Sequence, residues 1–272
     1  MRQFAINKIC LKELSFEQAI DATARAGFHG ITPWYDDVSH LSPREARRLI
    51  AHSGLKVSGF CNCGLYALKG KDGRRAAIDE AKRNIEYAAE LGASSIVTVV
   101  GGLLPASKNL DEARDFAFDC LAETLEFARA TPVTLALEAL HPMYTPDWSV
   151  VTSLATANDW CERLGTGIGL AVDSYHTWWD PTVYAEIEKA GKSDRIATYH
   201  ISDWLVPTNH MLLDRGMPGE GVIDLVEFDN RVQSAGYDGP IEVEIFSERL
   251  WKQDPDQFLA DLMERCQSTY GG

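Results

Sequence analysis

Eight apolar, strand-like runs recur along the chain, and a helix-like segment follows each of them. The runs have the near-continuous apolar or β-branched character of parallel strands that are buried on both faces. Alternation of this kind predicts a parallel sheet, and eight units in 272 residues favour a closed barrel over an open sheet. We therefore predict an α/β protein with a single (β/α)8 barrel domain over residues 1–272. The runs lie at residues 3–8, 29–34, 55–60, 94–100, 133–138, 167–172, 195–201 and 240–245.

Helix-start signals and helical spacing of apolar residues indicate helices between these runs. Ser15 with Gln18, and Ser42 with Glu45, have the spacing of a capping box. Apolar residues recur at helical spacing through residues 78–91, and a glycine ends that pattern. The first run is not followed by a G-x-G-x-x-G sequence, which argues against a dinucleotide-binding sheet.

Composition excludes some classes of partner. The formal net charge is −14, and a surface of this sign repels nucleic acid and anionic membranes. The chain has no apolar run of about 18 residues, so we expect no transmembrane helix. Its six cysteines are dispersed and its start reads as a strand, which predicts a cytoplasmic protein without disulfides. Cys61 and Cys63 could form a thiol site, but loop or wall residues at a strand end are the favoured interpretation.

Four residues able to bind a metal stand at the ends of four successive runs. They are Glu138, Asp173, His200 and Glu244. Because the carboxyl ends of barrel strands meet at one mouth, and neighbouring strands lie about 4.8 Å apart, these side chains can reach one ion. Three carboxylates and one imidazole suit Mn²⁺ best, with Mg²⁺, Co²⁺ or Zn²⁺ as alternatives. The competing interpretation makes each residue a partner in a salt bridge at the rim.

Several motifs resemble the xylose isomerase-like TIM barrel superfamily, the group of sugar phosphate isomerases and epimerases. The resemblance covers essentially the whole chain. It implies that the four residues above are the ligands of one divalent ion. It also implies that His176 lies beside the substrate oxygens, and that Arg215 reaches the substrate from the loop after the seventh strand. The motifs are LALEALHP, VDSYH, YHISDW, DRGMPGEGVIDL and EVEIF.

The resemblance further implies a divalent-metal-dependent isomerase or epimerase that acts on a small sugar or keto-sugar. Glu138 and Glu244 would remove a proton next to the carbonyl and return it, with an enediolate as the intermediate. For His141 two interpretations stay open, a second acid/base group or a packing residue. His176 could instead be a rim histidine, and Arg215 could pair with Asp214 or Glu220. Proteins of this group often form dimers or tetramers, and the sequence does not determine the assembly.

The predicted mouth carries aromatic residues and one long connection. Aromatic side chains can pack on the apolar faces of a sugar, and we expect at least two of them to line the pocket. Trp34, Trp178 and Trp204 are the substrate-binding candidates, with Tyr35 and Trp179 nearby; walls of the barrel or an oligomer interface are the alternative. The connection at residues 202–224 is long enough to predict a functional loop. Arg215 alone is weak evidence for a phosphorylated substrate.

Three rival functions can be weighed against the sequence. A lyase or dehydratase acting on a keto-sugar or 3-keto-glycoside shares the first step, as in inosose dehydratases and C-glycoside-cleaving barrels, and His141 would serve as its acid. Apurinic-site endonucleases of the superfamily need further histidines, which the CNCGLY and GGLLPA segments after the third and fourth runs lack. Their D-x-H pair is replaced here by Asp214–Arg215–Gly216. Retention of all four ligands argues against a catalytically inactive sugar-binding barrel.

Overall fold

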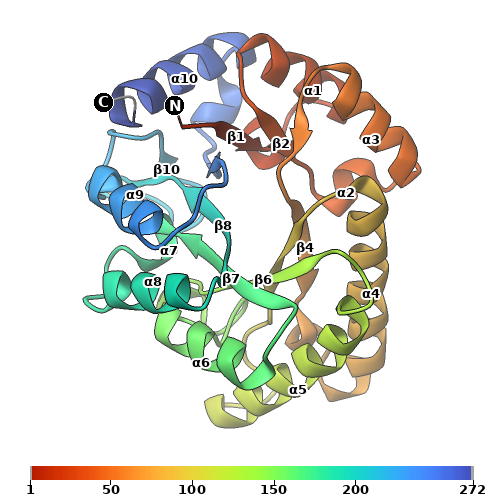
Figure 1. Ribbon diagram of the computed structural model, residues 1–272. Coiled ribbons are helices and arrows are strands. Elements are labelled where there is room, and N and C mark those ends of the chain that lie inside the picture. The colour runs from red at the N-terminus through yellow and green to blue at the C-terminus, as the bar shows by residue number, and fades with distance from the viewer. Residues whose placement is uncertain (1, 271–272) are drawn as a thin grey trace.

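The computed structural model describes residues 2–270, which form a nearly closed barrel of parallel strands with helices around the outside (Figure 1). The strands follow the order β3-β2-β1-β11-β8-β7-β6-β5-β4, so chain neighbours are mostly spatial neighbours. Seven of the eight predicted runs each form one strand, and the predicted fold class is confirmed. The barrel strands are β1 (Phe4–Asn7), β2 (Gly30–Thr32), β3 (Lys56–Val57), β4 (Phe60–Gly64), β5 (Ser95–Val99), β6 (Thr134–Glu138), β7 (Ile168–Asp173), β8 (Ile196–Ile201) and β11 (Ile241–Val243).

The third predicted strand differs from the structure. It is split into β3, which pairs with β2, and β4, which pairs with β5. An isolated parallel bridge from Trp34 to Cys61 spans the two sides. The prediction that residues 61–66 form the exit after this strand is therefore wrong for its first four residues, because β4 continues to Gly64. Cys61 and Cys63 are buried wall residues of β4, as the favoured interpretation proposed, and all six cysteines are free.

Helices cover the outer surface of the barrel and begin where the sequence signals them. Ser15 and Gln18 form a capping box at the start of α1, and Ser42 and Glu45 form another at the start of α3. Gly92 is the left-handed residue that ends α4. The α-helices are α1 (Phe16–Arg25), α2 (Tyr35–Val38), α3 (Pro43–His52), α4 (Arg74–Leu91), α5 (Leu110–Ala128), α6 (Leu154–Leu164), α7 (Ser174–Thr177), α8 (Val183–Lys192), α9 (Leu225–Ser234) and α10 (Pro255–Tyr270). Short 3₁₀ helices lie at Lys8–Leu11, Tyr66–Lys69, Lys71–Gly73, Pro142–Tyr144 and Leu250–Lys252.

The long connection after β8 is an ordered strap with a carboxylate at its centre. It contains the antiparallel pair β9 (Asp203–Trp204) and β10 (Arg215–Gly216). The fully buried carboxylate of Asp203 accepts hydrogen bonds from the backbone amides of Gly219 at 3.0 Å, Gly221 at 2.8 Å and Ile223 at 3.1 Å. These bonds hold the two ends of the strap together and fix the position of Arg215.

Apolar side chains fill the layer between strands and helices. Ile6, Ile31 and Ile85 are fully buried there, and Tyr199 of β8 stacks on Phe228 of α9 with nearly parallel rings. Burial on this scale is the main stabilising contribution in a domain of this size. In residues 2–270, none of the helices combines the length and the apolar character needed to cross a membrane.

Candidate metal centre

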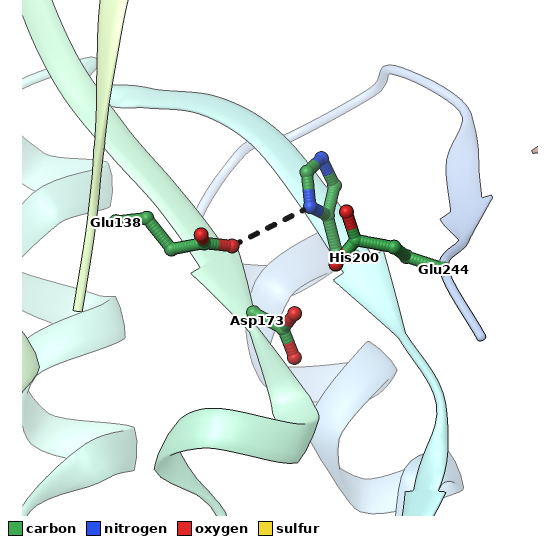
Figure 2. Close-up of side chains that lie close together, drawn as sticks. All are labelled: Glu138, Asp173, His200 and Glu244. Atoms are coloured by element: carbon green, nitrogen blue, oxygen red, sulfur yellow. Dashed lines mark ion pairs between the residues drawn. The ribbon is translucent and has the colours of Figure 1, made fainter. Parts of the chain in front are cut away.

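Four metal-binding side chains converge at the carboxyl end of the barrel. Glu138 and Asp173 are the last residues of β6 and β7, His200 is the penultimate residue of β8, and Glu244 directly follows β11. All four are at most 5% exposed, and one ligand atom from each lies within 4.8 Å of those of the other three. Figure 2 shows Glu138 and Glu244 entering the cluster from opposite sides. The structure thus brings together the residues that the sequence places at strand ends, while their role as ligands stays a prediction.

The cluster offers the atoms that a cation would bind. Glu138 Oε1, Asp173 Oδ2 and His200 Nδ1 are buried, and within the described residues none of them has a hydrogen-bond partner. Glu138 Oε1 and His200 Nδ1 face each other at 3.7 Å (Figure 2). Leaving polar atoms unpaired in the interior costs free energy, and a divalent ion would satisfy all three at once. The donor set, rich in carboxylate oxygen, fits such an ion.

Burial changes the acid–base equilibria of the cluster. It raises the pKa of Glu138, that of Asp173 to about 6 and that of Glu244 to about 7. For His200, burial opposes protonation, but the neighbouring carboxylates, Glu242 first, raise the pKa to about 10. In the absence of a cation the cluster therefore holds protons in its place, which is the behaviour expected of several carboxylates buried together.

A hydrogen-bond network beneath the cluster links it to β1. His200 Nε2 lies 3.1 Å from Thr198 Oγ1 and 3.7 Å from Glu242 Oε1. The side-chain amide of Asn7, at the end of β1, donates to Glu242 Oε1 at 2.9 Å and to Glu244 Oε1 at 3.1 Å. Sequence analysis missed Asn7 and Glu242. The signal for Glu242 was its spacing of two from Glu244, which places both side chains on the same side of a strand.

Arg215 reaches the cluster from the strap, where the resemblance implied it would be. Its side chain is 2% exposed, and one terminal nitrogen donates to Glu244 Oε2 at 3.2 Å and lies 3.8 Å from Asp173 Oδ2. Its guanidinium group lies over the rings of Tyr175 at 4.4 Å and Phe246 at 4.8 Å. Packing of this kind holds a planar cation in one orientation.

The alternative pairing of Arg215 with Asp214 or Glu220 is not the one in the structure. Asp214 instead accepts two hydrogen bonds from Asn209 within the strap. Glu220 pairs with Arg249 at 2.7 Å. The strap therefore satisfies these two acidic residues at its surface and leaves Arg215 to the buried carboxylates.

His176, in α7, is buried beside Arg215 and is neutral. Burial, and then the charge of Arg215, keep its pKa well below the usual value. Its Nδ1 accepts the backbone amide proton of His141 at 3.2 Å, so the imidazole proton must be on Nε2. Nε2 lies 3.2 Å from a terminal nitrogen of Arg215. Two donors therefore lie side by side, an arrangement that suits one shared acceptor oxygen.

His141 packs at the rim of the mouth between two tryptophans. Its ring centroid lies 5.5 Å from that of Trp179 and 5.2 Å from that of Trp204. Its Nδ1 accepts the backbone amide proton of Met143, and burial lowers its pKa. The side chain does not belong to the cavity lining described below, so packing is the role that its contacts support.

A cavity lies above the four-residue cluster, and its wall is mainly apolar. Of the aromatic residues expected there, only Trp34 lines it. Trp204 stacks on Tyr175 and contacts Trp178, while Tyr35 packs on Tyr87, and none of these three expected residues belongs to the lining. Tyr144, Trp148 and Phe246 supply aromatic wall instead, which sequence analysis missed. The lining is Trp34, Asn62, Val99, Glu138, Leu140, Tyr144, Trp148, His176, Leu212, Arg215, Glu244 and Phe246.

Comparison with known proteins places this geometry in a family. A family model described as the xylose isomerase-like TIM barrel matches residues 20–266. A solved structure, protein SMc04130 from Sinorhizobium meliloti 1021, is 44% identical, with a TM-score of 0.95 and coverage of 99% of this chain and 98% of that one. The IOLI protein with a bound zinc atom is 20% identical, with a TM-score of 0.83 and coverage of 99% and 98%. At 20% identity, the likeness to the IOLI protein shows the fold alone.

Curated relatives carry enzyme names of more than one reaction class. A 3-dehydroshikimate dehydratase from Pseudomonas aeruginosa is 28% identical over 247 residues, which are 85% of this chain but 36% of the relative. An inosose isomerase from Bacillus velezensis is 27% identical over 208 residues, which are 74% of this chain and 71% of the relative. The chain thus spans little more than a third of the length of the dehydratase that it matches.

Proposed function

Because the chain belongs to the xylose isomerase-like TIM barrel family, we propose that it is a divalent-metal-dependent sugar isomerase or epimerase. The reaction would begin with removal of a proton next to a substrate carbonyl and would pass through an enediolate. The observation that carries the proposal is that Glu138 and Glu244 belong both to the metal-binding cluster and to the cavity lining. Each carboxylate is therefore within reach of a substrate proton as well as of an ion.

The residues of the site divide the chemistry between them. A bound divalent ion would supply Lewis-acid polarisation of the carbonyl. Glu138 and Glu244 enter from opposite sides, so one can take the proton and the other can return it (Figure 2). The paired donors of His176 and Arg215 would hold a substrate oxygen as negative charge develops on it. Return of the proton to the opposite face gives an epimer, and return to the neighbouring carbon gives an isomer.

We propose Mn²⁺ as the resident ion, with Mg²⁺, Co²⁺ and Zn²⁺ as the alternatives. Three carboxylates and one imidazole form a hard donor set, which supports Mn²⁺ or Mg²⁺. The IOLI protein, a barrel of the same fold, has a bound zinc atom, which supports a transition metal as an alternative. The ion would be held by Glu138, Asp173, His200 and Glu244.

The substrate contacts and the setting of the enzyme complete the proposal. Trp34, which lines the cavity, is the best supported of the three tryptophan contacts; Trp178 and Trp204 would act only if the substrate extends to the rim. The substrate would be a small sugar or keto-sugar and not a nucleic acid, which the charge of −14 disfavours. We propose a cytoplasmic enzyme, as a dimer or tetramer in keeping with its family.

Elimination from a keto-sugar is the second candidate, and the dehydratase relative supports it. Its first step uses the same carboxylates, and a leaving group on the next carbon would then depart. His141 is the acid proposed for that departure, although it packs at the rim outside the cavity lining. Incubation with a 3-keto-glycoside would distinguish the two candidates, because only elimination releases the aglycone.

Solvent-deuterium exchange into candidate ketoses tests the proposal. We expect the Mn²⁺-loaded protein to incorporate deuterium next to the carbonyl, as followed by proton NMR. Treatment with EDTA should stop the exchange, and added Mn²⁺ should restore it. Exchange that continues at the same rate after complete removal of the metal would refute a metal-dependent mechanism.

A further inference from the structure

We propose that the cavity selects an uncharged, ring-shaped ketone and rejects phosphorylated ketoses. The inference rests on the proposed function, because it names the class of substrate for that same site. It concerns three properties of the cavity wall: its charge, the state of its polar groups and the shape of its apolar surface. The polar groups and the apolar surface are set by residues outside the four-residue cluster, and the charge is set by Arg215 together with the cluster carboxylates.

The charge of the cavity leaves nothing to bind a phosphate dianion. Of the residues that line it, all within the described chain, Arg215 alone carries a full positive charge. That charge is already paired with Glu244 and Asp173. The three cluster carboxylates together balance Arg215 and one divalent ion. A phosphate would therefore enter a site without a free cation, whereas phosphate sites supply arginine or lysine side chains or a helix N-terminus.

The polar groups of the wall are mostly engaged with the protein. Trp34 Nε1 donates to Asn7 Oδ1 at 2.6 Å, and the Tyr144 hydroxyl donates to the carbonyl oxygen of Met211 at 2.5 Å. Both aromatic residues thus present their carbon faces to the cavity. Outside the reacting end, the Asn62 amide and the indole N–H of the exposed Trp148 are the remaining polar groups of the wall, and both are uncharged. A phosphate group here would lose water and gain at most these uncharged donors, with no cationic side chain to balance its charge.

The apolar surface of the wall suits a ring. Phe246 and Trp34 meet edge to face, with centroids 6.0 Å apart and planes at 86°, so they form a corner of two flat surfaces. Leu140, Leu212 and Val99 supply the rest of the apolar wall. The C–H faces of a saturated ring pack on such surfaces while its ketone and one adjacent hydroxyl point to the cluster. An open-chain polyol has no continuous apolar face to offer.

Three probes test these properties with two readouts. The probes are 2-keto-myo-inositol, which is an uncharged ring, D-xylulose, which is uncharged, and D-xylulose 5-phosphate, which adds the phosphate to the same sugar. Binding to the Mn²⁺-loaded protein is measured by titration calorimetry, and chemistry by deuterium exchange. We expect 2-keto-myo-inositol to bind most tightly and D-xylulose more weakly. D-xylulose 5-phosphate should bind at least about 100-fold more weakly than D-xylulose.

A variant that gains binding of the phosphorylated probe distinguishes the effect of a missing positive charge from a general inability of the site to bind ligands. Leu212 lies in the wall and is partly exposed, so Leu212→Arg should add a cation to the cavity and improve binding of D-xylulose 5-phosphate by about tenfold or more. Val226→Arg adds the same charge on the exposed surface of α9 and should leave the binding of all three probes unchanged.

The outcomes separate the inference from the proposed function. If D-xylulose 5-phosphate binds and exchanges as well as D-xylulose, the inference is wrong and the proposed function stands. The inference is also wrong, and the proposed function again unaffected, if D-xylulose binds more tightly than 2-keto-myo-inositol. If none of the three probes binds or exchanges with any of the four metals, the proposed function fails and the inference fails with it.

Discussion

Glu138 and Glu244 differ from the other two candidate ligands by one property, their access to the cavity. Asp173 and His200 lie beneath the cavity, whereas the two glutamates are part of its wall. Glu244 is also the most constrained of the four, since Asn7 holds its Oε1 and Arg215 holds its Oε2. A carboxylate fixed at both oxygens keeps one orientation, which a proton-transfer group needs.

Replacement of either glutamate by glutamine should abolish proton transfer. Glu138→Gln and Glu244→Gln keep the shape of the side chain but remove its basicity and a metal ligand. Because a positioned acid or base contributes about 10²–10⁴-fold, we expect the rate of deuterium exchange to fall by at least this factor. Glu248→Gln, an exposed glutamate close to Glu244 in the chain, is the matched control and should behave as wild type. Exchange in either cavity variant at more than a tenth of the wild-type rate would argue against its role.

The raised pKa values of the cluster predict that the metal-free protein loses stability as pH rises. The pKa of Glu244 is raised to about 7 and that of Asp173 to about 6, so the folded state holds protons that the unfolded state has released above about pH 4.5. Removing these protons between pH 5 and 7 leaves buried, mutually repelling charges. The pKa of His200 is raised to about 10, so its contribution is lost at still higher pH and has the same sign.

Thermal unfolding in EDTA measures this dependence. We expect the Tm of the chelated protein to fall by on the order of 5 °C between pH 5 and pH 8. The Mn²⁺-loaded protein should lack this fall, because the ion takes the place of the protons. Glu244→Gln should reduce the slope in EDTA. A Tm that is flat or rises with pH in EDTA would show that the cluster does not bind protons in this way.

At the scale of elements, the strap after β8 determines where Arg215 lies. The Asp203 carboxylate holds the strap in place, because its two oxygens accept hydrogen bonds from the backbone amides of Gly219, Gly221 and Ile223. A neutral asparagine could accept with one oxygen only. We therefore expect Asp203→Asn to loosen the strap, to lower kcat/KM about 10–100-fold and to leave metal affinity unchanged. Steady-state kinetics, metal titration and limited proteolysis of residues 202–224 measure the three effects.

A second aspartate in the strap provides the control for this prediction. Asp214 bonds only to Asn209 in the strap and is partly exposed, so Asp214→Asn should change neither kinetics nor proteolysis appreciably. Loss of metal binding in Asp203→Asn would mean that the substitution disturbs the whole barrel mouth and not the strap alone.

Local signals explain which elements could be predicted. Capping boxes at Ser15 and Ser42 and the glycine after α4 are short-range features, so those helix boundaries were accessible from the sequence. The split between β3 and β4 was not, because β4 is defined by distant partners: Phe60, Cys63 and Gly64 pair with β5, and Cys61 bridges to Trp34 after β2. Contacts that are distant in sequence decide such cases.

At the scale of the whole molecule, barrel closure explains why the site was easier to predict than its surroundings. The four cluster residues stand at strand ends, and any closed parallel barrel brings strand ends to one mouth. The cavity wall depends on loops. Trp148 and Leu212 enter it from connections whose paths no periodicity describes, whereas Trp178 and Trp204 contact each other and do not line it. Asn7 comes next to Glu242 and Glu244 only through the pairing of β1 with β11, which no local pattern indicates.

The same closure predicts that the metal stabilises the whole molecule. One ion would connect β6, β7, β8 and the segment after β11, and these four strands are neighbours in the barrel. An ion that binds only the folded state at about 100 times its Kd adds about 2.7 kcal/mol, or roughly 5–10 °C in Tm for a chain of this size. We expect EDTA to lower the Tm by this amount and added Mn²⁺ to restore it. Asp173→Asn should remove most of the metal-dependent increase, and Asp238→Asn, an exposed aspartate in the turn before β11, should retain it. An equal Tm with and without metal at pH 8 would mean that no ion joins these strands.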